Sequence, residues 1–215
     1  MKKLLTQADL IATAKAFCAE RHAHRELFGI TDGKAIGTFI ERRFQERLTA
    51  VYRVQAGNSA LGLDLPAIET DMKVTSIRQP QSSCPFRSAR QKVYGLGYNL
   101  LLFVYDKIDS RRDRTAALKF VSSAFIDKSR TADYQTTRGL LEILNRDGNR
   151  DDIVAFLMDR NLPGDEIVHN SLADEIMASP PRLGYLTISN ALQWRLQYSR
   201  IVSLTETISG IVKIV

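Results

Sequence analysis

The segment YNLLLFVYD at residues 98–106 constrains the fold of this chain more than any other stretch. Its apolar residues follow one another without the polar alternation of a strand that has one face in water. A short run of this kind between turns is typical of a strand buried on both faces. A helix is expected just before it, over residues 82–97, with Pro85 in its first turn and Gly95 or Gly97 at its end. A helix followed by a buried strand predicts an α/β fold, in which helices flank a mixed β-sheet.

The length and composition are those of a chain with a substantial core. With 215 residues, of which 44% are hydrophobic, it can form one domain with a smaller appendage. No run approaches the ~18 apolar residues of a membrane span, and Asp9 and Lys15 interrupt the apolar start, so we expect a soluble, cytoplasmic protein. Cys18 and Cys84 match no metal-site spacing and are expected to be thiols in a reducing compartment.

Three further patterns predict the elements on either side of the buried run. Residues 36–52 repeat apolar side chains, among them Ile36 and Leu48, at three- and four-residue steps and predict an amphipathic helix. Residues 61–65 and 68–75 are interpreted as two short strands that form a hairpin. The segment ALKFVSSAFI, which ends at residue 126, is expected to be the next strand.

Beyond residue 130 the sequence changes to helical segments separated by Asp-Gly-Asn, Pro-Gly and Pro-Pro breaks. We therefore divide the chain into a core of residues 1–130 and a helical C-terminal subdomain of residues 131–215. Residues 185–204 are expected to form a packing helix with a basic edge, and the alternative is a recognition element. His22 and His24 lie two residues apart, which does not suit one face of a helix, and both are expected to be solvated.

Charged residues interrupt apolar sequence in LGLDLPAIETDMKVTS, which ends at Ser76. Asp71 and Lys73 point to one side of an extended strand, and the fold-back of the hairpin brings Asp64 opposite them. Two carboxylates and the carbonyl oxygen of Met72 would bind a hard cation such as Mg²⁺, which activates water for phosphodiester hydrolysis. Lys73 would orient that water or neutralise charge on the phosphate. The alternative is a surface hairpin with a cross-strand ion pair.

An acid, a short gap and then acid–any–Lys on adjacent strands resembles the signature of the PD-(D/E)xK nuclease superfamily. The spacing from Asp64 to Lys73 is similar to that of the MutH-like mismatch-repair nucleases and the type II restriction endonucleases. Upstream, GKAIGTFIE at residues 33–41 resembles the helix that supplies a further active-site acid in this family. That resemblance implies Glu41 as the helix acid, with Glu46 as the alternative.

The distribution of charge favours DNA as the partner. Residues 72–130 contain twelve Lys and Arg against four Asp and Glu, the excess expected of a surface that meets phosphates. Arginine and glutamine side chains contact phosphates and base edges in DNA complexes. The candidate DNA contacts that follow the acid motif are Arg78, Gln79, Gln81, Arg87, Arg90 and Gln91.

The resemblance, which covers residues 33–105, implies a restriction-endonuclease-like core and a type II restriction endonuclease that cleaves double-stranded DNA at a specific site by Mg²⁺-assisted hydrolysis. Cutting both strands of a palindrome requires two active sites, so a homodimer is expected. The alternatives are a monomeric repair nuclease that nicks DNA and a non-catalytic DNA-binding partner with a nuclease fold. Residues 131–215 would then add DNA contacts or dimerise.

Overall fold

The computed structural model describes residues 2–54, 62–83, 88–189 and 194–215. They form two compact units, which are described separately. The first comprises residues 1–82, 99–126 and 206–215, and the second comprises residues 83–98 and 127–205. The chain passes from one unit to the other more than once, whereas the division expected at residue 130 is a single boundary. Separate domains with that boundary stay a prediction.

The first unit is built on a mixed β-sheet, which confirms the predicted α/β class. Its strands lie in the order β10, β7, β6, β4, and β2 pairs with another stretch of β7. Their bounds are His22–His24 for β2, Thr70–Ser76 for β4, Asn99–Ser110 for β6, Thr115–Ile126 for β7 and Ile211–Lys213 for β10. Strand β4 is parallel to β6, with Lys73 opposite Leu102, and β6 is antiparallel to β7. Residues 100–104 of β6 are fully buried, as expected for the apolar run.

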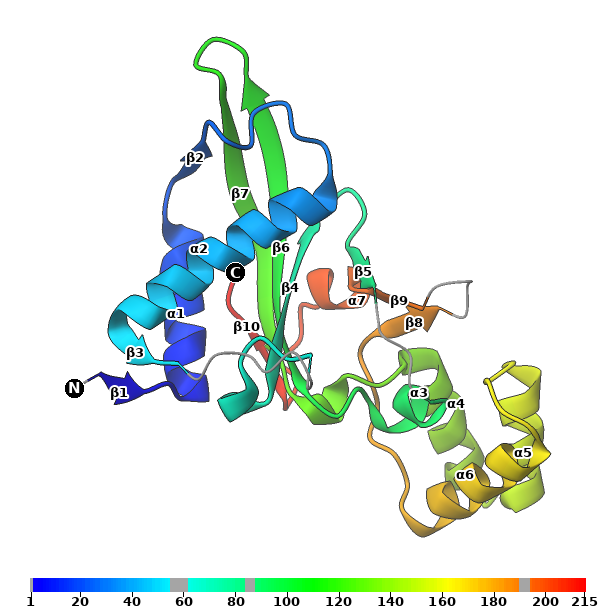
Figure 1. The fold of residues 1–215 in the computed structure, drawn as a ribbon. Coiled ribbons are helices and arrows are strands. Elements are labelled where there is room, and N and C mark those ends of the chain that lie inside the picture. The colour runs from blue at the N-terminus through cyan, green and yellow to red at the C-terminus, as the bar shows by residue number, and fades with distance from the viewer. Residues whose placement is uncertain (1, 55–61, 84–87, 190–193) are drawn as a thin grey trace. The chain divides into compact units, whose positions relative to one another are not determined.

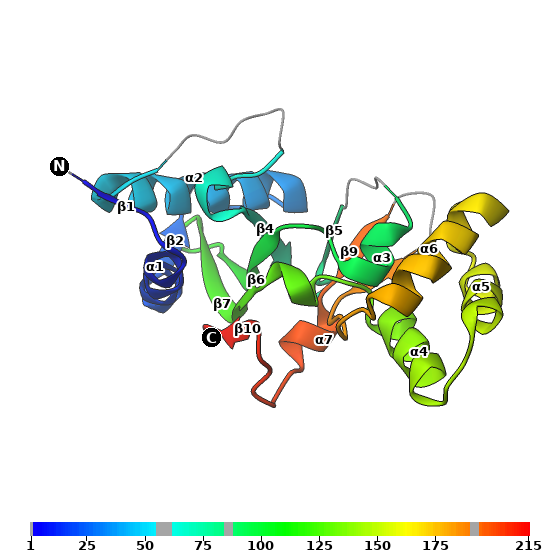
Figure 2. The same cartoon turned by 90° about the horizontal axis from the view of Figure 1, so that it is seen from below.

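Helices α1 (Gln7–Ala19) and α2 (Gly33–Val51) cover one face of this sheet (Figures 1 and 2). Helix α2 confirms the predicted amphipathic helix, because its apolar stripe is buried. Phe44 of α2 packs against Phe103 of β6 with ring centroids 5.1 Å apart, and Phe17 of α1 lies 5.2 Å from Phe44. Truncation of one such aromatic side chain in a core costs about 3–5 kcal/mol, so this ring cluster is a main source of stability.

The end of α2 and the start of the chain are joined by a two-stranded ribbon. Strand β1 (Lys3–Leu4) pairs in parallel with β3 (Tyr52–Arg53), which follows α2 directly. Nearer its start, α2 approaches β4 closely at Gly37, where an added Cβ atom would lie 3.8 Å from the Cβ of Val74. The approach places the middle of α2 beside the strand that carries Asp71 and Lys73.

The hairpin expected over residues 61–75 is wrong in its first arm. Residues 62–64 are not in a strand, Leu65 forms only an isolated bridge with Thr70, and Leu61 lies outside the described residues. Between them η1 (Pro66–Ile68) forms a 3₁₀ turn that ends at Glu69, whose φ of 47° is left-handed. Proline fixes a φ suited to a helical first turn, so the chain reverses through this turn and a single strand follows.

The solvated role expected for His22 is also wrong. His22 is buried in β2, its Nε2 lies 2.7 Å from the carbonyl oxygen of Phe17, and its ring packs edge-on against Phe120. The pairing of β2 with β7, almost one hundred residues later, draws the segment into the sheet. His24, by contrast, is partly exposed.

The second unit is mainly helical and has its own apolar core. Helices α4, α5 and α6 surround buried residues such as Leu140, Ile153 and Ile176. Side chains of Asp133, Asn149 and Asp165 cap the N-termini of these three helices. The bounds of its elements are Arg90–Tyr94 for α3, Lys128–Arg130 for η2, Tyr134–Asn145 for α4, Arg150–Asp159 for α5, Glu166–Ala178 for α6, Thr187–Ser189 for β8, Arg195–Gln197 for β9 and Ser199–Val202 for α7.

Two expected helices differ from the structure. The packing helix expected over residues 185–204 is wrong, because β8 and β9 pair there as antiparallel strands and only the short α7 follows. Helix α3 ends at Gly95 as expected but is much shorter than predicted, and Pro85 lies outside the described residues. Strand β5 (Gln81–Ser83) precedes it in the chain. Within the described residues, no helix is both long and apolar enough to cross a membrane.

Candidate active site

Asp71 and Lys73 form an ion pair on β4. The Lys73 Nζ lies 2.6 Å from the Asp71 Oδ2, and Asp71 is only 5% exposed. Strand alternation puts both side chains on one face, while Met72 between them points into the core beneath α2. The predicted pairing of this acid with this lysine therefore matches the geometry of the strand.

Asp64 is brought to the same place by the turn that precedes β4. Its Oδ2 accepts a hydrogen bond from the backbone N–H of Met72 over 2.8 Å. The pKa of Asp71 is raised to about 6, chiefly by burial; Lys73 lowers it, and a hydrogen bond with Asp64 raises it further. The two carboxyl groups therefore lie against each other, although the segment of Asp64 is a turn and not the predicted strand.

Glu41 of α2 belongs to the same cluster. The pKa of Glu41 is raised to about 7, chiefly by burial and also by the charge of Asp64, while Lys73 opposes the rise. The alternative helix acid, Glu46, is exposed and lies 3.7 Å from Arg42. Of the two candidate helix acids, Glu41 is therefore the one that lies near Asp64 and Asp71. Strand β4 is the last strand in the sheet order, so a side chain from α2 can approach its open edge.

The charges of this cluster do not balance. In the part of the chain that the structure describes, the carboxyl groups of Glu41, Asp64 and Asp71 share one ammonium group, that of Lys73. Burial is the main cause of the raised pKa values of Glu41 and Asp71, and the neighbouring carboxylates add to the rise because clustered carboxylates resist ionisation unless a cation compensates them. Among the described residues no three Asp, Glu, His or Cys side chains are arranged to hold a metal ion on their own. Hard divalent cations take oxygen ligands, which the Asp64 and Asp71 carboxylates could supply, and their binding of a metal stays a prediction.

The structure separates the expected DNA contacts. Arg78 and Gln79 are exposed in the turn after β4, and the backbone oxygens of Gln79 and Gln81 accept hydrogen bonds from the Thr75 hydroxyl over 3.1 and 3.0 Å. Those three candidates belong to the first unit. The turn is therefore held by the Thr75 hydroxyl, and the exposed side chains of Arg78 and Gln79 remain available to a ligand.

The other expected DNA contacts come from the chain after β5. Arg90 and Gln91 lie in α3 of the second unit, and Arg87 lies outside the described residues. The Arg90 guanidinium is held by the Glu175 carboxylate through contacts of 3.0 and 2.6 Å. Its contact with DNA stays a prediction, as do those of the other five candidates.

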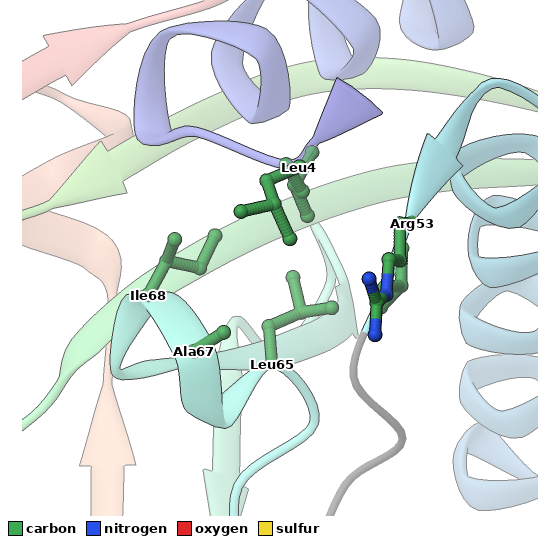
Figure 3. A pocket seen from close by; sticks show the side chains of 7 residues that line it. Leu4, Arg53, Leu65, Ala67 and Ile68 are labelled. Atoms are coloured by element: carbon green, nitrogen blue, oxygen red, sulfur yellow. The ribbon is translucent and has the colours of Figure 1, made fainter. Parts of the chain in front are cut away.

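A cavity of about 650 Å³ lies next to the acid turn but has a different character (Figure 3). Leu4, Leu65 and Ile68 point toward its space, and Arg53 lines one side. Its lining contains no carboxylate, and Asp64 and Asp71 lie outside it. The chemistry is therefore expected at the edge of β4 and not inside an enclosed pocket, which suits a polymeric substrate.

The mixed α/β core, with Asp71 and Lys73 on an edge strand and Asp64 and Glu41 beside it, is of the restriction-endonuclease-like class. Comparison with known proteins agrees with it: the model of the family described as "Type II restriction enzyme NspV" matches residues 4–213. The curated type II restriction enzyme NspV of a Nostoc species is 53% identical over 213 residues, 98% of this chain and 97% of that protein. The chain therefore belongs to the NspV family of type II restriction enzymes. No solved structure matches it.

Proposed function

We propose that this chain is a Mg²⁺-dependent type II restriction endonuclease that cleaves double-stranded DNA at a specific site through Asp64, Asp71, Lys73 and Glu41. The observation that carries the proposal is the half-buried cluster in which three carboxyl groups meet one lysine. Membership of the NspV family favours this function over a nicking repair nuclease or a non-catalytic binding partner. Because the substrate is DNA, we place the enzyme in the cytoplasm.

The metal ligands in this proposal are the carboxylates of Asp64 and Asp71 and the carbonyl oxygen of Met72. Mg²⁺ prefers oxygen ligands and retains several waters, so a small protein donor set of this kind suits it. When bound, the ion lowers the pKa of a coordinated water and stabilises charge that develops on the phosphate. The hydrogen bond from the Met72 N–H to Asp64 fixes one carboxylate relative to the backbone of the other ligand.

Lys73 and Glu41 supply the proton chemistry. The Lys73 ammonium, 2.6 Å from Asp71, donates to the attacking water or to a phosphate oxygen and balances part of the charge of the transition state. A base works best when its pKa lies near the working pH, and the pKa of Glu41 is about 7. As the water oxygen bonds to phosphorus, its proton passes to Glu41, and the bond from phosphorus to the leaving deoxyribose oxygen breaks. That oxygen takes its proton from a solvent water.

A homodimer is the assembly that this function requires. A palindromic site presents the same sequence on both strands, and two copies related by a twofold axis place one active site at each strand. Light scattering of the protein with and without DNA measures this directly. A mass of one chain per cleaved duplex would contradict the dimer while leaving the chemistry of the active site untouched.

The cleavage test uses a plasmid and a phage DNA incubated with the protein in Mg²⁺ or in EDTA. Discrete bands are expected from the wild type in Mg²⁺ only, and sequencing their ends identifies the site. Asp71→Asn and Lys73→Ala are expected to lose cleavage and keep DNA binding, whereas Lys15→Ala, an exposed lysine on α1, serves as the matched control. Cleavage that survives EDTA or Lys73→Ala would refute the proposed active site.

A further inference from the structure

Strands β6 and β7 form a long hairpin, and β2 pairs with β7 as far as Ala116, close to the turn of that hairpin. In Figure 1 its turn extends beyond α1 and α2. Residues 111–114 form the turn, all four are exposed, and the flanking residues Ser110 and Thr115 are paired across the strands. Ile108, two residues before the end of β6, is 67% exposed, which shows that this face of the hairpin is uncovered in the described residues. We refer to residues 111–114 as the hairpin tip.

The hairpin tip carries a concentrated positive charge. Its residues are Arg111, Arg112, Asp113 and Arg114, and within the described parts of the chain none of the three arginines forms an ion pair. The nearby acid Asp109 is already engaged by the Lys107 ammonium at 2.6 Å and by the backbone N–H of Gly29 at 3.2 Å. The guanidinium groups are therefore left for an external anion.

The tip also has a fixed shape. The Ser110 hydroxyl donates to the Asp113 carboxylate over 2.9 Å, and the Asp113 backbone N–H donates back to that hydroxyl over 3.3 Å. The acid of the tip is thus used to close the turn. An arginine that is held on an ordered turn loses less conformational entropy on binding than one on an unstructured tail.

The register of the sheet gives the greatest distance that can separate the tip from the active site. Lys73 lies opposite Leu102, nine residues before Arg111 along β6. A strand rises by about 3.3 Å per residue, so the tip lies about 30 Å from the catalytic lysine. Phosphates along one DNA strand are spaced by about 3.4 Å along the axis, so the tip reaches no farther than about nine base pairs from the scissile phosphate.

We propose that the hairpin tip binds the phosphate backbone of duplex DNA outside the recognition site, through Arg111, Arg112 and Arg114. The inference rests on the proposed function, because DNA is then already held at β4. Three arginines on an uncovered, ordered turn match an extended row of phosphates, which guanidinium groups bind through paired N–H donors. These contacts carry no base information and would add affinity on any flanking sequence.

The test measures how DNA affinity depends on salt for the wild type and for Arg111→Gln/Arg112→Gln/Arg114→Gln, in EDTA so that no cleavage occurs. The probes are a 40-base-pair and a 10-base-pair duplex centred on the site mapped from wild-type cleavage. Each phosphate contact adds about 0.9 to the slope of log affinity against log salt, so the variant should lose about 2–3 from that slope per tip, or about 5 for the two tips of the proposed homodimer on the long duplex. Between 50 and 200 mM salt the wild type would then lose about 40-fold more affinity than the variant per tip, or on the order of 10³-fold for the dimer.

Two controls test whether the change in slope depends on flanking DNA and on the positive charge of the tip: a short duplex and a variant that keeps the charge. The 10-base-pair duplex extends only five base pairs to each side of its centre, so wild type and variant should differ less in slope on it than on the long duplex. Replacing the three arginines by lysine should keep the wild-type slope on the long duplex. Equal slopes on the long duplex would overturn the inference, as would a variant whose oligomeric mass changes, because the tip would then be a contact between copies. Absence of cleavage by the wild type would instead reject the proposed function, and a 40-base-pair mixed-sequence duplex would still report on the tip.

Discussion

Replacing Glu41 with glutamine is expected to stabilise the metal-free protein at alkaline pH while it lowers DNA cleavage. The Glu41 carboxyl has its pKa raised from 4.5 to about 7 by burial and by Asp64. The folded protein therefore binds this proton more tightly than the unfolded chain does. Its stability falls as the pH rises from 4.5 to about 7 and stays low above that range. A glutamine side chain does not ionise in this pH range, so the variant does not show this loss of stability as the pH rises.

The magnitude follows from the size of the pKa shift. One pKa unit corresponds to about 1.4 kcal/mol, so a rise from 4.5 to about 7 would cost about 3 kcal/mol for a fully buried carboxyl. Glu41 is only half-buried, and solvent screening reduces the expected gain of the variant to about 1–2 kcal/mol at pH 8. For a chain of this size that is a rise in Tm of roughly 2–8 °C.

The assay is thermal denaturation in EDTA at pH 8 and at pH 4.5, followed by the same scans in Mg²⁺. The gain of Glu41→Gln should be present at pH 8, vanish at pH 4.5, and shrink in Mg²⁺, because the bound ion compensates the wild-type carboxylates. Glu46→Gln is the matched control on the same helix and should show no pH-dependent gain, since Glu46 is exposed. A Glu41→Gln protein that is less stable than the wild type at pH 8, or equally stabilised at both pH values, would refute the reasoning.

Substitutions at three further positions test the active site and the helix and core that hold it. Asp64→Asn keeps an acceptor for the Met72 N–H and should lose cleavage with little change in stability, whereas Asp64→Ala should cost a further ~1–3 kcal/mol in urea denaturation. Gly37→Ala should be tolerated and stabilise α2 by up to about 1 kcal/mol, because an added Cβ meets Val74 at an ordinary contact distance of 3.6–3.8 Å; a loss of stability would show that the helix cannot accept it. Phe103→Ala should lower the unfolding free energy by about 3–5 kcal/mol.

The parts of the fold that the sequence predicted are those set by local patterns. The unbroken apolar run around Phe103 specified a strand buried on both faces, and the period of the stripe through Phe44 specified α2. Asp71 and Lys73 could be paired from strand alternation alone, because that rule needs no tertiary contact. The position of Glu41 came from the family resemblance, since no local pattern distinguishes it from Glu46.

The parts that were missed depend on distant pairing or on backbone detail. His22 is buried because β2 joins β7, and residues 211–213 return to the same strand from the far end of the chain. Both segments are too short for their sequences to show the alternation of apolar and polar residues that predicts a strand. The expected first arm of the hairpin failed because Pro66 starts a 3₁₀ turn and Glu69 takes a left-handed conformation. Asp64 still reaches Asp71, through its bond to the Met72 N–H, which no sequence rule indicated.

The bond between Asp64 and the backbone of β4 affects how relatives of this enzyme should be interpreted. β4 is the outermost strand of its sheet, and an open strand edge can recruit another chain and aggregate. The Asp64 carboxylate occupies one of its outward N–H groups. A diverged relative that no longer cuts DNA would therefore still gain from an acceptor at this position. Retention of the equivalent of Asp64 is weak evidence for activity in such a sequence, and the pair equivalent to Asp71 and Lys73 is the better marker.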